Sequence, residues 1–266
     1  MIRFSANLSM LFREVPELER PAAARRAGFE AVEMQFPYDH EAVQWRAALD
    51  TAGVELVLYN IPAGDFMTGG QGLAGVPGRE DAFREAVAQA AQAARVLRPR
   101  NVNVLAGCPG PEHDRERCLD TLAANLQYAA RVMADIGVGV VIEAINSVDR
   151  PGYLIDRTQA ALAAIDRAGH PNLRLQYDIY HMQVMEGDLI RTLRTHCARI
   201  GHIQFADNPG RHEPGTGEIH FGHVFAALDQ LPYDGFVGAE YLPSRRTEDT
   251  LDWLQGGFRR SAETAR

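Results

Sequence analysis

The stretch that decides the fold reads Val138-Gly139-Val140-Val141-Ile142-Glu143, an apolar, β-prone run that a carboxylate closes. Three later runs have the same form; they span 173–178, 200–204 and 236–240 and end in Asp178, Gln204 and Glu240. The strand ends of a parallel barrel built from repeated strand and helix units converge on one mouth, so we expect these four side chains to meet there. Three carboxylates and an amide oxygen predict a site for a hard divalent cation.

Eight candidate strands alternate with segments whose apolar residues recur at helical spacing. The predicted strands are 2–7, 31–34, 55–60, 101–105, 139–143, 173–178, 200–205 and 236–240, and the clearest helical segments are 80–97 and 118–133. Gly28, Gly53 and Gly137 follow helical patterns and precede strands, where a left-handed helix end is expected. A chain of 266 residues fits one (β/α)8 barrel of about 250 residues. We therefore predict an α/β fold with a single TIM barrel over 1–255 and a C-terminal tail over 256–266.

Composition excludes several classes of function. The net charge of −8 argues against a nucleic-acid partner or a basic membrane surface. No apolar run approaches the ~20 residues of a membrane helix, and the N-terminus lacks a signal-peptide pattern, so we expect a cytoplasmic protein. All 27 basic residues are arginine, so the chain cannot form a Schiff base, anchor pyridoxal phosphate or complete a Walker A loop.

The cysteines and the connecting segments carry further expectations. Cys108, Cys118 and Cys197 are odd in number and widely spaced, which indicates reduced, mostly buried thiols and no disulfide framework or zinc site. The segments after the third, fourth and seventh strands are long and rich in Gly and Pro, so function is expected to concentrate there. The segment 61–79 is long enough to fold over the mouth.

Seven motif strings stand in order along the chain. They read SANLSMLF at 5–12, FPYD at 36–39, NIPAGD at 60–65, IEAIN at 142–146, QYDIYHMQ at 176–183, ADN at 206–208 and EPGTGEI at 213–219. In these strings the chain closely resembles the hydroxypyruvate isomerase family, which belongs to the xylose-isomerase-like TIM barrels. The resemblance runs from residue 1 to 253. It implies a metal-assisted isomerase that interconverts hydroxypyruvate and 2-hydroxy-3-oxopropanoate through an enediolate.

The resemblance also implies roles for particular residues. Glu143, Asp178, Gln204 and Glu240 fall where the wider superfamily holds its divalent metal, and Glu143 and Glu240 fall on the pair that shuttles the proton. Because Gln204 stands where many members have histidine, a neutral oxygen ligand shifts the metal preference toward Mg²⁺ or Mn²⁺ and away from Zn²⁺.

Two further positions follow from the resemblance. His181 matches a substrate-contacting histidine of related sugar epimerases and isomerases, and Arg211 matches an arginine near the substrate oxygens. A guanidinium binds a carboxylate through two parallel hydrogen bonds, so Arg211 is the expected partner of the substrate carboxylate.

The residues by themselves leave other interpretations open. His181 also fits a capping or core histidine, and Gln204 an amide that satisfies backbone groups at the barrel rim. Arg211 also fits a surface arginine paired with Glu213 or Asp207. The alternative activities are a 2-oxo-tetronate isomerase, a ketose 3-epimerase and a non-catalytic sugar-acid binding protein on the same barrel. The sequence does not fix the oligomeric state, and a homo-oligomer is one option.

Overall fold

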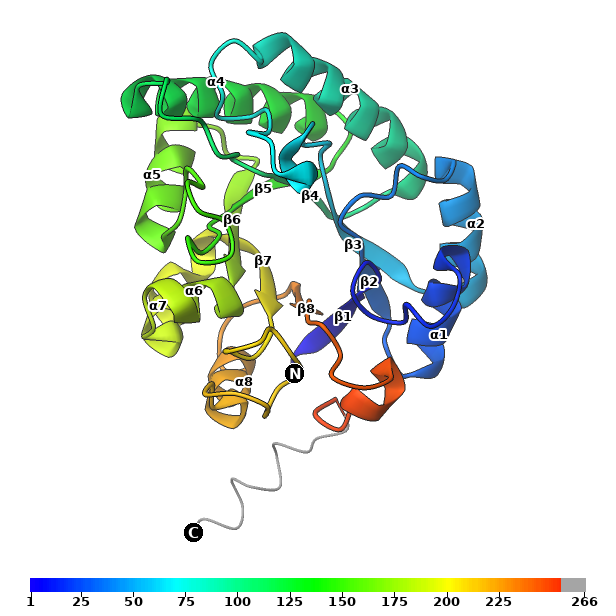
Figure 1. The fold of residues 1–266 in the computed structure, drawn as a ribbon. Coiled ribbons are helices and arrows are strands. Elements are labelled where there is room, and N and C mark those ends of the chain that lie inside the picture. Colours follow the sequence, from blue (N-terminus) through cyan, green and yellow to red (C-terminus); the bar gives the residue numbers. More distant parts are fainter. Residues whose placement is uncertain (255–266) are drawn as a thin grey trace.

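Eight parallel strands close into a barrel in the computed structural model, which describes residues 1–254, and helices cover the outside (Figure 1). The strands follow one another in sequence order, and β8 pairs with β1. Their bounds are β1 Arg3–Asn7, β2 Ala31–Glu33, β3 Glu55–Asn60, β4 Asn101–Val104, β5 Gly139–Glu143, β6 Leu173–Asp178, β7 Ile200–Phe205 and β8 Phe236–Ala239. Every predicted strand is confirmed to within one residue at each end, and the predicted single TIM barrel is confirmed with them. The predicted tail at 256–266 lies outside the described residues.

Helices occupy most of the connections between successive strands. Their bounds are α1 Arg20–Arg26, α2 Ala42–Ala52, α3 Glu80–Leu97, α4 Arg115–Ala134, α5 Thr158–Ala168, α6 Ile179–Met185, α7 Leu189–His196 and α8 Phe221–Asp229. The predicted helix at 80–97 matches α3, and the one at 118–133 lies inside α4. None of these helices combines the length and the apolar character that crossing a bilayer would require.

Helix α3 illustrates how sequence spacing builds the outer layer. Phe83, Val87, Ala90, Ala94 and Leu97 recur every three or four residues and are all buried against the barrel. Each large apolar side chain buried in this way contributes about 1.5–3 kcal/mol, so the stripe determines which face of the helix turns inward. Most of the core therefore lies between the strands and the helices.

The turns that lead into the strands use glycine where the backbone requires it. Helix α2 ends at Gly53, whose φ of 64° is in the left-handed region that glycine adopts without steric cost. Gly28 and Gly137 also have positive φ, at 103° and 74°. The left-handed conformation predicted for all three glycines is confirmed.

The interior of the barrel is polar over much of its length. Eleven buried polar residues from strands or strand ends lie inside it, and ten of them fall into two hydrogen-bonded groups. Asn60, Asn103 and Glu143 form one group. Ser5, Asn7, Glu33, Gln176, His202, Gln204 and Glu240 form the other. The eleventh, Asp178, pairs with Arg211, which also pairs with Glu240. A packed barrel interior is ordinarily dominated by branched apolar side chains. An interior of carboxylates and amides therefore marks the position of the functional site.

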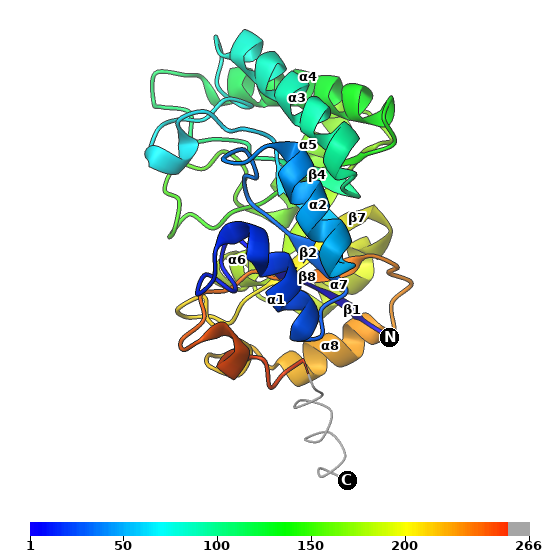
Figure 2. The same cartoon turned by 90° about the vertical axis from the view of Figure 1, so that its right-hand side faces the viewer.

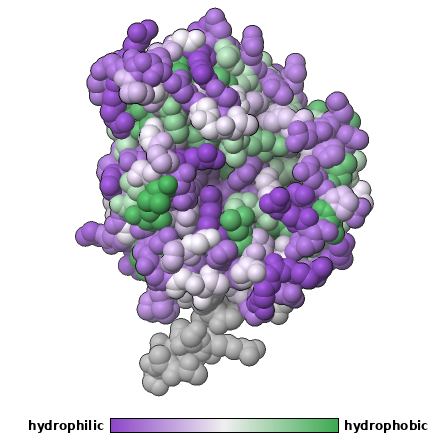
Figure 3. All heavy atoms as spheres, in the orientation of Figure 1, coloured by the Kyte–Doolittle hydropathy of each residue, from purple (hydrophilic) through white to green (hydrophobic). Residues whose placement is uncertain are grey.

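The connections after the strands gather at one end of the barrel, on the left of Figure 2. The segments after β3 and β7 are long, as predicted. The segment after β4, 105–114, is shorter than 144–157 after β5, which the sequence analysis missed. In the orientation of Figure 1, which looks onto this end, the centre is hollowed and hydrophilic (Figure 3). All three cysteines are free thiols, but only Cys118 is fully buried, while Cys108 and Cys197 are half-buried.

Candidate active site

Glu143 is the last residue of β5, and its side chain is almost fully buried. Its Oε2 accepts a hydrogen bond of 3.0 Å from Nδ2 of Asn103 on the neighbouring strand β4. Burial, followed by repulsion from Glu240 and Asp178, raises the pKa of Glu143 well above its ordinary value. A carboxyl group with a raised pKa at the mouth of a barrel is suited to proton transfer near neutral pH.

Asp178 occupies the equivalent place at the end of β6, where it also caps helix α6. Its Oδ1 accepts a hydrogen bond of 2.8 Å from the backbone N–H of Tyr180, so the first turn of the helix fixes the carboxylate. Burial raises the pKa of Asp178 to about 7, against the opposing attraction of Arg211 and with a further increase from Glu240.

Glu240 follows β8 directly and faces the same interior. Its Oε1 accepts hydrogen bonds from Nδ2 of Asn7 at 2.9 Å and Nε2 of Gln35 at 3.2 Å. Its Oε2 lies 2.6 Å from a terminal nitrogen of Arg211. Burial raises the pKa of Glu240, and the nearby guanidinium counteracts part of that rise. The two glutamates predicted to shuttle a proton therefore have different surroundings, because only Glu240 has a direct cationic partner.

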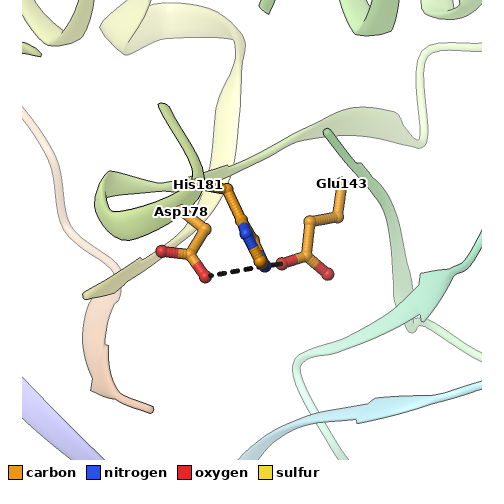
Figure 4. A group of neighbouring side chains, drawn as sticks. All are labelled: Glu143, Asp178 and His181. Carbon is orange, nitrogen blue, oxygen red and sulfur yellow. Dashed lines mark ion pairs between the residues drawn. The ribbon is translucent and has the colours of Figure 1, made fainter. Parts of the chain in front are cut away.

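His181 joins this group from the first turn of α6. Its Nε2 lies 3.6 Å from Oδ2 of Asp178 and 3.8 Å from Oε1 of Glu143, and the ring stands between the two carboxylates (Figure 4). The ring is buried, and burial, with a contribution from Arg211, lowers the pKa of His181 well below its ordinary value. Glu143, Asp178 and His181 are close enough to hold a metal ion together.

Arg211 reaches the site from the segment after β7. Its backbone has a φ of 56°, which is uncommon for a residue with a side chain. Besides its contact with Glu240, a terminal nitrogen lies 3.7 Å from Oδ2 of Asp178, and the guanidinium carbon lies 5.2 Å from the ring centre of Tyr180. Its buried Nε has no hydrogen-bond partner among residues 1–254. One donor of the guanidinium is therefore left for a ligand.

The alternative interpretation of Arg211 as a surface arginine paired with Asp207 or Glu213 is wrong. The Asp207 carboxylate accepts backbone hydrogen bonds from residues 208, 215, 217 and 219 and so fixes the shape of its own segment. Glu213 accepts hydrogen bonds from the backbone and hydroxyl of Ser244. Both acidic groups hold the segment that presents Arg211, while the arginine itself points to the mouth.

Gln204 lies beneath the mouth, and both the nitrogen and the oxygen of its amide form hydrogen bonds. Its Nε2 donates to Oε1 of Glu33 at 2.7 Å, and its Oε1 accepts from Nε2 of Gln176 at 2.5 Å. The alternative that this amide satisfies backbone groups at the rim does not describe these contacts, since both partners are side chains. An amide oxygen has two lone pairs, and Gln176 uses one of those of Gln204.

Glu33 is a fully buried carboxylate that the sequence analysis did not select. It accepts hydrogen bonds from Ser5 at 3.1 Å, Asn7 at 3.2 Å, His202 at 2.8 Å and Gln204. Burial alone would raise the pKa of Glu33, but the attraction of His202 and these hydrogen bonds together hold it below the ordinary value. Glu33 closes the short apolar run 31–33 just as Glu143 closes 138–143, and this pattern would have identified it.

The charges at the mouth fit a cation. Glu143, Asp178 and Glu240 are all buried, and Arg211 is their only cationic neighbour among the described residues. Burial raises all three pKa values. Repulsion within the trio adds to the rise for Glu143 and Asp178, and repulsion from Glu33 adds to it for Glu240, which means that full ionisation requires more positive charge than the chain itself supplies. Carboxylates and a neutral amide oxygen are ligands that hard divalent ions accept.

Comparison with known proteins places the chain in a family. A family model described as "Xylose isomerase-like TIM barrel" matches residues 21–256, and the chain belongs to this family. It is 44% identical over 254 residues to hydroxypyruvate isomerase of Escherichia coli (strain K12), covering 96% of this chain and 98% of that protein. It is also 44% identical over 255 residues to 2-oxo-tetronate isomerase of Cupriavidus necator, with 96% and 98% covered. The resemblance found in the motif strings is confirmed.

A solved structure agrees with the same placement. The crystal structure described as AP endonuclease, family 2, from Brucella melitensis superposes with a TM-score of 0.93 at 39% sequence identity. The match covers 96% of this chain and 99% of that one.

Proposed function

We propose that the protein is an aldose–ketose type isomerase that interconverts hydroxypyruvate and 2-hydroxy-3-oxopropanoate. The observation that carries the proposal is the placement of two buried glutamates with raised pKa values, Glu143 and Glu240, in one polar mouth together with a single arginine. Support also comes from the 44% identity to the E. coli hydroxypyruvate isomerase over nearly the full chain.

The reaction moves one carbon-bound proton and one hydroxyl proton. The proton on C3 of hydroxypyruvate moves to C2, and the proton on the C3 hydroxyl moves to the C2 oxygen, so no atoms are gained or lost. One of the two glutamates removes the C3 proton as a carboxylate, and the other delivers a proton to C2 as a carboxylic acid. Proton transfer by a positioned side chain typically accelerates a reaction by ~10²- to 10⁴-fold.

A divalent ion fits the residues of this mouth. We assign Glu143, Asp178, Gln204 and Glu240 as the residues that would hold it, with Mg²⁺ or Mn²⁺ as the preferred ion because all four offer oxygen. When bound, such an ion supplies Lewis-acid stabilisation of negative charge on the two adjacent substrate oxygens.

Arg211 and His181 orient the substrate in this proposal. The unpartnered Nε of Arg211, with a terminal nitrogen, offers the donor pair that a carboxylate accepts. His181 Nε2 faces the space between Glu143 and Asp178, where a substrate oxygen would sit. Together these contacts fix the reacting carbons between the two glutamates.

The second candidate substrate is a 2-oxo-tetronate, which is one carbon longer. The 44% identity to the Cupriavidus necator 2-oxo-tetronate isomerase specifically favours it. One additional carbon changes discrimination by only ~1–3 kcal/mol, so a single mouth of this kind is compatible with either acid.

Proton NMR in deuterated buffer tests the proposal. Metal-replete protein is incubated with hydroxypyruvate and, separately, with a 2-oxo-tetronate, and both reactions are repeated after chelation. We expect metal-dependent conversion of hydroxypyruvate with deuterium entering C2 of the product. Faster conversion of the tetronate would transfer the assignment to the longer acid. Turnover of neither acid by folded, metal-loaded protein would overturn the acid-isomerase assignment and leave the ketose 3-epimerase and the silent sugar-acid binder, of which only the epimerase would turn over ketohexoses.

A further inference from the structure

Asn146 contacts the site histidine from the segment after β5. Its Nδ2 lies 2.7 Å from Nδ1 of His181, and both side chains are buried. Which atom donates in this contact depends on the tautomer of the imidazole, because a neutral ring carries its proton on one nitrogen only. The tautomer decides whether the other nitrogen, which faces the mouth, is a hydrogen-bond donor or a lone pair.

The orientation of the Asn146 amide can be established without reference to the histidine. Its Oδ1 accepts hydrogen bonds from the backbone N–H groups of Val148, at 3.1 Å, and Asp149, at 2.8 Å. Its Nδ2 donates to Oδ2 of Asp149 at 3.0 Å. Rotating the amide by 180° would point its NH₂ group at two N–H donors and its oxygen at a carboxylate. Three partners therefore fix the nitrogen on the side of His181.

The consequence for His181 follows directly. An amide NH₂ group is a donor only, so Nδ1 of His181 has to accept and carries no proton. The ring proton then sits on Nε2, which faces the carboxylate oxygens of Asp178 at 3.6 Å and Glu143 at 3.8 Å. Two acceptors on one side of the ring and one donor on the other side favour the same tautomer.

We propose that Asn146 is a positioning residue that holds His181 as the Nε2–H tautomer, so that the histidine donates a hydrogen bond into the mouth. The catalytic consequence of this arrangement rests on the proposed function, but the assignment of the tautomer does not. A protonated Nε2 has no lone pair in the ring plane for a metal ion, although Glu143, Asp178 and His181 are spaced for one. The metal-holding role then remains with oxygen ligands, and His181 stabilises negative charge on a substrate oxygen.

A pair of exchanged side chains offers a sharp test. The double variant Asn146→Asp/Asp149→Asn keeps the net charge and retains acceptors for both backbone N–H groups and a hydrogen bond between positions 146 and 149. It reverses the polarity that faces the histidine, because the new carboxylate accepts where the amide donated. The Tyr180 hydroxyl, which donates to Oδ2 of Asp149 at 3.0 Å, can accept from the new amide instead. We expect this variant to move the ring proton to Nδ1. The single variant Asp149→Asn, which keeps the Asn146 amide, is the matched control and should retain Nε2–H.

Long-range ¹H–¹⁵N correlation spectra of protein labelled at histidine, loaded with Mg²⁺, report the tautomer directly. The His181 signals are assigned by their loss in His181→Gln. We expect a protonated Nε2 and an unprotonated Nδ1 in the wild type, and the reverse in the double variant. A wild-type spectrum with Nδ1 protonated, or an unchanged tautomer in a folded double variant, would overturn the proposal. If the double variant does not fold, Asn146→Ala replaces it, and a mixture of tautomers is expected.

Kinetic measurements separate a failure of the Asn146 proposal from a failure of the proposed isomerase function. Loss of one preorganised donor of this kind typically lowers kcat by ~10²- to 10³-fold, and we expect that loss in the double variant with Mn²⁺ affinity, measured by calorimetry, unchanged. A folded double variant with wild-type kcat would contradict the donor role. If the wild-type protein turns over neither acid, the proposed function fails, while the NMR result still decides the tautomer and the role of Asn146.

Discussion

Two sets of buried carboxylates lie in the same barrel, Glu33 alone in its interior and Glu143, Asp178 and Glu240 at its mouth. Their pKa values are shifted in opposite directions. Glu33 inside the barrel accepts hydrogen bonds from four side chains, and its pKa is held below the ordinary value. Glu143, Asp178 and Glu240 at the mouth have fewer donors and one shared arginine, and all three pKa values are raised. Burial is nearly complete in both sets, so the partners, with His202 foremost for Glu33, and not the depth make the difference.

The contrast separates a structural carboxylate from a functional one. Glu33 has its ionised form satisfied, and it fixes the amide of Gln204 and the side chain of Asn7 beside the mouth. Gly238 makes room for it, because a Cβ there would lie 2.2 Å from Oε2 of Glu33. The mouth carboxylates are satisfied only in part, which is the state expected of groups that bind a cation and exchange protons with a substrate.

The largest expected effect concerns the mouth. Glu143→Gln should lower kcat by ~10²- to 10⁴-fold, because the amide cannot exchange a proton, while ligand binding persists. Steady-state kinetics and a binding measurement on the same preparation provide the check. Glu30→Gln, at an exposed glutamate, is the control. Turnover close to that of the wild type would contradict the acid–base role, and absence of turnover in both proteins would favour the silent binder.

Arg211→Gln should raise the KM for an acidic substrate by ~10- to 100-fold, since hydrogen bonds to charged groups contribute ~1.5–3 kcal/mol. The exposed Arg245→Gln variant, close to the mouth after β8, serves as the matched control. Initial rates over a range of substrate concentrations measure the change. An unchanged KM would remove Arg211 as the carboxylate partner and would make the ketose alternative more attractive.

Replacing the interior carboxylate Glu33 by an amide should lower the stability of the fold. Glu33→Gln places an amide NH₂ group among four donors, so the free energy of unfolding should fall by ~1–3 kcal/mol. Urea denaturation of metal-free protein measures it beside Glu143→Gln, which removes a carboxyl group with a raised pKa and should cost little or nothing. Equal losses of unfolding free energy in Glu33→Gln and Glu143→Gln would contradict the distinction between Glu33 and the carboxylates at the mouth.

The stability of the metal-free protein should also depend on pH. The pKa of Asp178 is about 7 when folded, against ~3.9 for an unperturbed aspartate, so the folded state binds the proton more tightly. Its contribution to stability is present below pH ~4 and is lost as the pH rises through about 7. Asp178→Asn, which keeps the helix cap, should therefore gain stability relative to the wild type between pH 5 and pH 8. Parallel unfolding curves at the two pH values would contradict the raised pKa.

The sequence predicted the barrel closely because strand and helix periods were clean along the chain. The convergence of Glu143, Asp178 and Glu240 was also predictable, since parallel strand ends meet at one mouth. The partners of Arg211 were not, because they depend on a left-handed backbone at that residue and on how Asp207 shapes the segment. Its position after the seventh strand gave the region but not the contacts.

The supporting amides show another limit of sequence reasoning. Asn103 bonds Glu143 and Asn7 bonds Glu240 across neighbouring strands, and such pairs depend on the register between strands that lie far apart in the chain. The tautomer of His181 depends likewise on three hydrogen bonds of Asn146, which only the folded segment reveals. The residue types were visible in the motif strings, whereas their roles required the geometry.

Calorimetric titration of Mn²⁺ into the metal-free protein tests the central claim most directly. Experiments at pH 6 and pH 8, each in two buffers with different ionisation enthalpies, give the number of protons released on binding. Because the mouth carboxylates share raised pKa values, we predict tight binding with proton release at pH 6 and less release at pH 8. No binding, or binding without proton release at either pH, would contradict the account.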